Sequence, residues 1–163
     1  MTIPLRTPPR VRIQLSMSLR ACALISLFLC TIGASSQTTS GVLGDWREPT
    51  GSVIEIFTCG HDVCAKMIAI SKRAPTQFDE KNPDPSARKH LLCGLQIGYG
   101  FHLTDPTHAD GGRLYDPKSG KTYRGAMTAD GDRLRLRGYI GIKAFGRSET
   151  WTRADRSAAV CAN

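Results

Sequence analysis

The sequence predicts an all-β protein, a single antiparallel up-and-down barrel. The clearest sign is the strict alternation of residues 134–137, Leu-Arg-Leu-Arg, which buries one face of a strand and exposes the other. Tight-turn chemistry is the second sign: residues 129–132 carry an Asp-Gly hairpin signal, and residues 116–120 place Pro and Gly as a type I turn requires. Short strands joined by such turns form a meander. We therefore expect any pocket inside a small barrel or at its mouth.

Residues 1–36 are predicted to be a signal peptide. Four arginines precede the apolar run 21–30, and small residues follow it at 31–36. We expect cleavage between residues 33 and 37, which leaves one domain, residues 37–163, in the periplasm or secreted. The apolar run is short for a bilayer span, so we do not expect an integral membrane protein.

The net charge gives little reason to expect a nucleic-acid partner. The chain has 22 basic and 14 acidic residues; the leader holds four of the basic ones and none of the acidic ones, so the charge falls from +8 to +4 after cleavage. The remaining charges are mixed in sign. Arg133, Arg135 and Arg137 form a basic stripe that fits the wet face of a strand. We expect no nucleic acid and a monomer.

Four cysteines remain after cleavage: Cys59, Cys64, Cys93 and Cys161. In an exported protein these most often form two disulfides, for which three pairings exist. A turn at residues 60–62 brings Cys59 and Cys64 to the base of one hairpin, so this pair is favoured, and Cys93 with Cys161 would hold the tail on the barrel. A zinc site from Cys59, His61 and Cys64 is the alternative, but a second pair of ligands is missing. We expect no metal and no cofactor.

A long Pro-rich loop spans residues 75–85. Its two successive Asx-Pro steps disfavour helix and strand alike. Asp79, Asn82 and Asp84 could form a cation or substrate loop, although their spacing matches no EF-hand. We expect them instead to have a structural role, capping turns and bonding the loop's own backbone.

Candidate ligand-lining residues are the aromatic and flexible apolar side chains that alternation predicts to face inward. Each of them also fits an ordinary core. The candidates are Tyr99, Tyr123, Tyr139, Met67 and Met127, with Ile54, Ile56, Leu95, Ile97 and Leu136 as further inward positions.

Signatures of catalysis are weak. The sequence lacks the Gly-x-Ser-x-Gly and His-Glu-x-x-His motifs. A His102–Asp105 or His108–Asp110 pair could act in acid–base chemistry, yet no nucleophile is placed beside either. We do not expect an enzyme, and a hydrolase is the least favoured of the functions considered.

The order of several motifs resembles the bacterial exported family called domain of unknown function 2147. The resemblance runs from about Gly44 to Arg153, and the blocks that carry it are Gly-Asp-Trp at 44–46, Asp79 with Asn-Pro-Asp-Pro at 82–85, Gly-Leu at 94–95, Tyr-Asp-Pro at 115–117, Gly-Lys-Thr-Tyr at 120–123, Leu-Arg-Gly-Tyr at 136–139, Gly-Arg at 146–147 and Trp-Thr-Arg at 151–153. It implies one exported lipocalin-like barrel of about eight strands with unassigned activity. The chain departs from the family's Leu-Arg and Arg-Pro-Leu at residues 87–88 and 90–92.

One feature is also similar to the wider calycin group. Trp46 opens the first strand and Arg153 closes the last, and the resemblance implies that the tryptophan packs beneath the arginine to seal one end of the barrel. Arg147 is the competing partner. These expectations favour a cell-envelope protein that binds a small hydrophobic ligand or lipid. The alternative is a structural or interaction protein with a filled barrel and an envelope partner.

Overall fold

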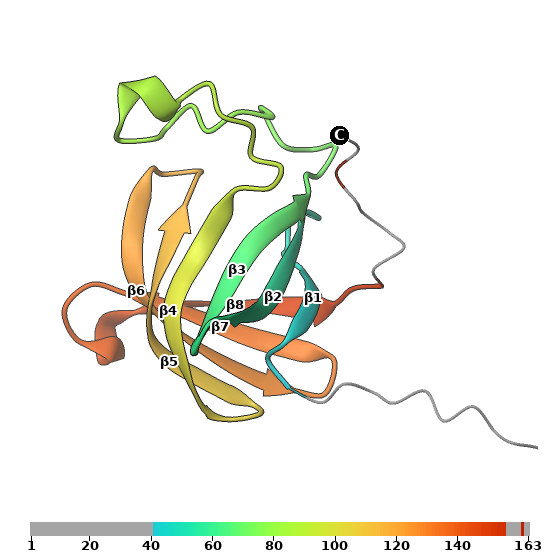
Figure 1. Ribbon diagram of the computed structural model, residues 1–163, viewed down its shortest axis with the longest axis vertical. Helices are drawn as coiled ribbons and strands as arrows, with labels where there is room; N and C mark the ends of the chain where they lie inside the picture. The colour runs from blue at the N-terminus through green and yellow to red at the C-terminus, as the bar shows by residue number, and fades with distance from the viewer. Residues whose placement is uncertain (1–40, 156–160, 162–163) are drawn as a thin grey trace, which may run out of the picture. The chain divides into compact units, whose positions relative to one another are not determined.

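The computed structural model describes residues 41–155 and 161, and these form a closed antiparallel barrel (Figure 1). Each strand pairs with the next, and β1 closes the ring against β8 through Trp46↔Arg153 and Arg47↔Thr152. The prediction of an all-β, up-and-down barrel of about eight strands is confirmed. The strands are β1 (Gly44–Arg47), β2 (Val53–Cys59), β3 (Asp62–Ala69), β4 (Gln96–Asp105), β5 (His108–Asp116), β6 (Lys121–Asp130), β7 (Arg133–Tyr139) and β8 (Arg147–Arg153), with 3₁₀ turns η1 (Pro85–Ala87) and η2 (Lys143–Phe145).

Alternation determines which side chains of β7 enter the barrel. Leu134 and Leu136 are buried in the core, whereas Arg133 and Arg135, which alternate with them, are exposed. The hairpin from β6 to β7 turns at Gly131, whose φ of 54° lies in the left-handed region that favours glycine. The period-two pattern and the Asp-Gly signal thus account for this hairpin.

In an up-and-down barrel, alternate connections lie at the same end. We call the end with the β1–β2, β3–β4, β5–β6 and β7–β8 connections the mouth, and the opposite one the closed end. The β3–β4 connection, residues 70–95, is the longest, and we call it the strap. Figure 1 shows it in green to yellow-green above the barrel.

The closed end is sealed by Trp46 and Arg153. The Arg153 guanidinium lies 3.7 Å from the centre of the Trp46 ring and donates to the carbonyls of Leu43 and Gly41, each at 2.9 Å. The indole N–H of Trp46 donates to the Val42 carbonyl at 2.8 Å. The expected contact between Trp46 and Arg153 is therefore present. Arg147 begins β8 beside the mouth and is not the partner.

Phe101 occupies the middle of the barrel and is fully buried. A Cβ atom added to Gly112 or Gly125 would overlap its ring, and one at Gly98 would lie 3.4 Å from it. These three glycines, on β5, β6 and β4, leave the space that the ring fills. The ring therefore forms a floor between the two halves of the interior.

Both expected disulfides are present. Cys59–Cys64 joins β2 to β3 at the closed end, with 5.9 Å between the Cα atoms, and Cys93–Cys161 ties the strap to the tail, with 6.0 Å. The Cys161 N–H also donates to the Ile68 carbonyl at 2.8 Å. With both of its sulfurs bridged, the Cys59–Cys64 pair does not hold zinc. No group of three or more potential metal ligands occurs among the described residues.

The predicted signal peptide and its cleavage site lie outside the described residues. Within residues 41–155 and 161, we find no helix with the length and apolar character needed to cross a bilayer.

Candidate functional site

The inner face of the mouth half carries apolar surface that is not fully covered. Ala65, Gly98, Leu114 and Tyr123 pair directly across β3 to β6. Directly paired residues point to the same face of a sheet, and Ala65 belongs to the buried core, so Leu114 and Tyr123 face inward. Both are nevertheless only partly buried. Inward apolar side chains with remaining exposure are the chemistry of an entrance for an apolar ligand.

The closed half differs because fully buried side chains fill its interior, except at its rim, where Leu103 pairs with the buried Ala109 and is 42% exposed. The inward side chains of Val63, Phe101 and Leu134 have at most 1% of their surface exposed. Close packing of this kind leaves no apolar surface for a ligand to cover. A site inside the barrel is therefore restricted to the mouth side of Phe101.

An ion pair crosses the mouth. The Lys118 ammonium, on the β5–β6 turn, lies 3.2 Å from the Glu48 carboxylate, on the β1–β2 turn. In a ring of eight strands these two turns stand opposite each other, so the pair spans the opening. We call this pair the latch. The latch is mostly accessible on its lysine side, because 61% of the Lys118 side chain is exposed against 7% for Glu48.

The carboxylate of Glu48 is held by its own turn. The backbone N–H groups of Thr50 and Ser52 donate to it at 3.0 and 3.2 Å, and the Thr50 hydroxyl donates as well. Burial tends to raise the pKa of Glu48, but the hydrogen bonds from Thr50 and the charge of Lys118 outweigh it, so the pKa lies below its ordinary value. The Glu48 carboxylate is thus held in place by its own turn, and the exposed Lys118 side chain pairs with it.

The strap is attached to the barrel through Asp79. This carboxylate is fully buried, and it accepts hydrogen bonds from the Tyr115 hydroxyl at 2.7 Å and the Asn82 side chain at 2.6 Å. Burial and the adjacent Asp79 raise the pKa of Tyr115, which keeps its hydroxyl a donor. Leu92, further along the strap, packs into the core.

The remaining polar residues of the strap bond its own backbone. The Asn82 side chain accepts from the Asp84 N–H at 2.9 Å, and Asp84 caps η1 by accepting from the Ser86 N–H at 2.9 Å. Asp79, Asn82 and Asp84 thus each form a side-chain hydrogen bond with another residue of the chain. The contact from Asp79 to Tyr115 on β5 was not predicted.

The predicted lining residues divide between three environments. Met67 and Met127 lie in the core with 9% and 1% of their surface exposed, and Tyr123 faces inward at the mouth. Tyr99 and Tyr139 lie on the outer face, so the expectation that they face inward is wrong. The register shows this: Tyr99 pairs with Arg113 and Tyr139 with Arg124, and these two arginines pair with each other.

An irregularity in β4 causes the error at Tyr99. The register with β3 shifts between Ala65↔Gly98 and Lys66↔Gln96, so Ile97 and Gly98 both lie on the core side. The extra residue turns Tyr99 outward. Tyr139 is an odd number of residues away from Leu134 and Leu136, so its side chain points to the other face of β7, outside the barrel. It is buried there because the β7–β8 loop packs over it.

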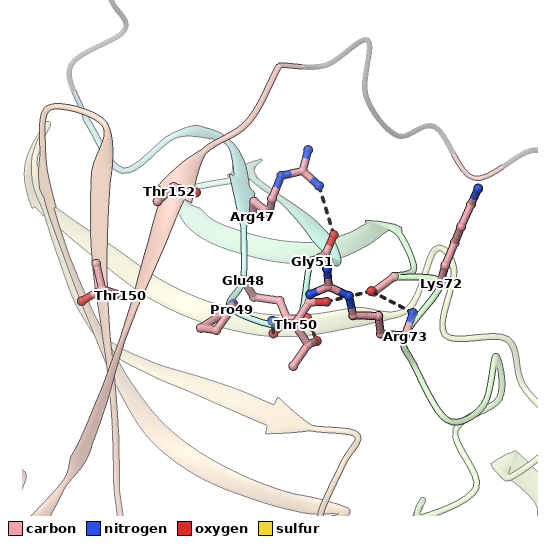
Figure 2. Close-up of a pocket in the computed structure, with 10 residues that line it drawn as sticks. Arg47, Glu48, Pro49, Thr50, Gly51, Lys72, Arg73, Thr150 and Thr152 are labelled. Atoms are coloured by element: carbon pink, nitrogen blue, oxygen red, sulfur yellow. Dashed lines mark hydrogen bonds between the residues drawn. The ribbon is translucent and has the colours of Figure 1, made fainter.

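A groove of about 590 Å³ lies on the outer face beside the β1–β2 turn (Figure 2). Arg47, Lys72 and Arg73 line it, together with the hydroxyls of Thr50 and Ser71. Figure 2 shows the three cationic side chains extending in different directions, with Arg47 donating to the Gly51 carbonyl at 3.1 Å. Because the cations do not converge on one point, the groove lacks the geometry of a specific anion site.

The histidines form different pairs from those expected. His102 lies 2.9 Å from Asp62, and His108 lies 2.9 Å from Asp105. The Thr107 hydroxyl and Asp105 both contact the same ring nitrogen, Nδ1 of His108. A catalytic triad uses the two ring nitrogens for different partners, so this cluster is a capped turn. Hydrogen bonds from Thr107 and His108 lower the pKa of Asp105 to about 2.

The fold is that of the lipocalin class, and comparison with solved structures agrees. Protein HP1028 from the human pathogen Helicobacter pylori, described as belonging to the lipocalin family, is similar with a TM-score of 0.65 and 21% sequence identity, over 73% of this chain and 86% of that one. This chain belongs to the family described as "uncharacterized protein conserved in bacteria", DUF2147, whose model matches residues 44–153. No curated protein matches the chain. The predicted family membership is confirmed.

Proposed function

We propose that this protein is an exported cell-envelope barrel that binds a small apolar or amphipathic molecule, such as a single-chain lipid, at its mouth. The observation that carries the proposal is the partial exposure of Leu114 and Tyr123 on the inner face. Apolar surface inside a barrel is stabilised when a ligand covers it, by about 25 cal/mol per Å².

The Phe101 ring limits how deep a ligand can enter the proposed site, and the latch covers the entrance. The ligand reaches as far as the Phe101 ring, and the latch of Lys118 and Glu48 gives way on entry. Only the Lys118 side of this ion pair is exposed. Solvent screening there limits the pair to about 1 kcal/mol, so we expect its opening to cost little. An amphipathic ligand would keep its polar end near the Lys118 ammonium.

The two disulfides support export, because such bonds persist in oxidising compartments such as the periplasm. Binding rather than catalysis is supported by the histidine pairs. The two histidine side chains are 73% and 51% exposed, and both pairs lie toward the closed end, away from the mouth.

Native mass spectrometry of the mature protein, exported in a bacterial host and titrated with palmitate, tests the proposal. We expect an adduct that is lost on denaturation. Replacing Tyr123 by Ala is expected to weaken palmitate binding about tenfold, which corresponds to about 1.4 kcal/mol. Tyr99→Ala is the matched control, since it removes the same side chain from the outer face of the neighbouring strands.

A bare protein that takes up no palmitate would contradict the proposal, as would equal losses in the two tyrosine variants. The filled-barrel interaction protein would then be the better account. The observation that favours this alternative is the full burial of Val63, Phe101 and Leu134 inside the barrel.

A further inference from the structure

The β7–β8 loop presents apolar side chains to solvent. Ile140, Ile142 and Phe145 are 72%, 61% and 83% exposed, and they are the three most exposed large hydrophobic residues of the described chain. All three lie within one seven-residue loop that contains η2. Figure 1 shows this loop, in orange-red, projecting from the barrel. Scattered exposed apolar residues need no explanation, but a protruding cluster marks an interaction site.

The loop is held firmly against the barrel wall. The Arg137 guanidinium donates to the carbonyls of Lys143 and Ala144 at 2.8 and 2.9 Å, and Lys143 forms an ion pair with Asp110 on β5. Gly146 packs onto β7 so closely that a Cβ atom there would lie 2.7 Å from the Gly138 carbonyl oxygen. A loop fixed in this way loses little conformational entropy when its apolar side chains are buried by a partner.

The adjoining outer face is basic. Arg124 on β6 pairs with Tyr139, the last residue before the loop. On its other side Arg124 pairs with Arg113 on β5, and Arg113 pairs in turn with Tyr99 on β4. Like charges directly opposite in a sheet are destabilising. Among the described residues, no carboxylate forms a salt bridge with either arginine. Asp110 lies within the electrostatic reach of Arg124 but is ion-paired with Lys143, so the two adjacent guanidinium groups still carry positive charge that a phosphate can offset.

We propose that these two features form one docking face for an anionic lipid bilayer. The face consists of Arg113, Arg124, Ile140, Ile142 and Phe145. The aliphatic and aromatic side chains of the loop enter the boundary between headgroups and acyl chains, and the arginines bind lipid phosphates. A bilayer fits better than a protein partner because exposed aliphatic and aromatic side chains beside cations are typical of surfaces that insert at the boundary of an anionic membrane.

The β7–β8 loop starts at the mouth end and folds back along the outer wall, where Lys143 meets Asp110 of β5, so docking places the side of the barrel against the bilayer. The inference goes beyond ligand binding and does not depend on it: a filled barrel would dock in the same way. If the mouth does bind a lipid, docking brings the barrel close to the membrane from which the lipid would come.

Flotation of the mature protein with vesicles tests the inference. We expect binding to phosphatidylcholine vesicles that contain about 30% phosphatidylglycerol, little binding to pure phosphatidylcholine, and release by added salt. The double variant Ile142→Ser/Phe145→Ser is expected to bind at least about tenfold more weakly. The double variant Arg113→Gln/Arg124→Gln is expected to lose the preference for the anionic vesicles.

Two matched controls separate docking from general effects. Leu103→Ser removes an exposed apolar residue from β4 near the closed end, and Arg133→Gln removes a charge from the same end of β7. Both are expected to bind like the wild type. Absence of vesicle binding by the folded wild type, or equal losses in the controls, would overturn the inference, and the loop would then be assigned to a protein partner.

Discussion

The two ends of this barrel are closed in different ways. At the closed end, Arg153 lies on the Trp46 ring and bonds backbone carbonyls, and the surrounding side chains are fully buried. At the mouth, closure depends on side chains from loops: the Lys118–Glu48 latch and the bond from Tyr115 to Asp79. We expect the packed contacts of Trp46 and Arg153 to be lost only on unfolding. The loop contacts at the mouth can open while the protein stays folded. We therefore expect the barrel to open at the mouth and to stay sealed at the closed end.

The largest effect is expected from the closed end. Trp46→Ala leaves a cavity under Arg153 and should lower the free energy of unfolding by about 3–5 kcal/mol. At the mouth, Tyr123→Ala should cost about 1 kcal/mol, because the ring is only partly buried. Urea denaturation of both variants measures the difference. Similar losses at the two ends would show that the mouth is packed like the closed end.

A pair of glycines sharpens the comparison. A Cβ atom at Gly112 would overlap the Phe101 ring, so Gly112→Ala should destabilise the protein by about 1–3 kcal/mol. Gly138, on the mouth side, has its nearest contact for a Cβ atom at 3.6 Å, on Tyr123, and Gly138→Ala should be nearly neutral. Thermal unfolding of the two variants provides the measurement.

A second substitution provides the control for this pair. Phe101→Leu introduced with Gly112→Ala should restore part of the lost stability if the overlap is the cause. Losses that simply add in the double variant would show that the ring is not what Gly112 accommodates.

Opening of the latch is expected to depend on pH. The pKa of Glu48 is lowered from its ordinary value of 4.5, so its contribution to stability is complete above that pH and is lost as the pH falls below it. Lys118→Met should therefore reduce stability at neutral pH by at most about 1 kcal/mol. At about pH 3, the difference between this variant and the wild type should shrink. A difference that stays constant between the two pH values would contradict the ion pair.

Local patterns predicted the fold well. Alternation at Leu134 and Leu136 and the turn at Gly131 hold in the structure because each depends on neighbouring residues. The irregularity at Ile97–Gly98 was missed, although a glycine within a strand often marks a bulge and Gly98 and Gly100 flank Tyr99. The outward turn of Tyr99 was missed with it.

The candidate site was less predictable. Lys118 and Glu48 are 70 residues apart, and only barrel closure brings their turns together. Gly98, Gly112 and Gly125 did carry a usable signal, because a glycine within a strand often marks a close approach by another group. The inward position of Tyr123 was predicted, and it remains the central residue of the proposed site.

The most direct test of reversible closure is an NMR titration of the ¹⁵N-labelled mature protein with palmitate. Ligand entry at the mouth predicts amide shifts that cluster at Gly98, Leu114, Tyr123 and Gly138, with Val63 and Leu134 of the closed half unaffected. Shifts confined to the outer face, or centred on the closed half, would contradict a ligand site on the mouth side of Phe101.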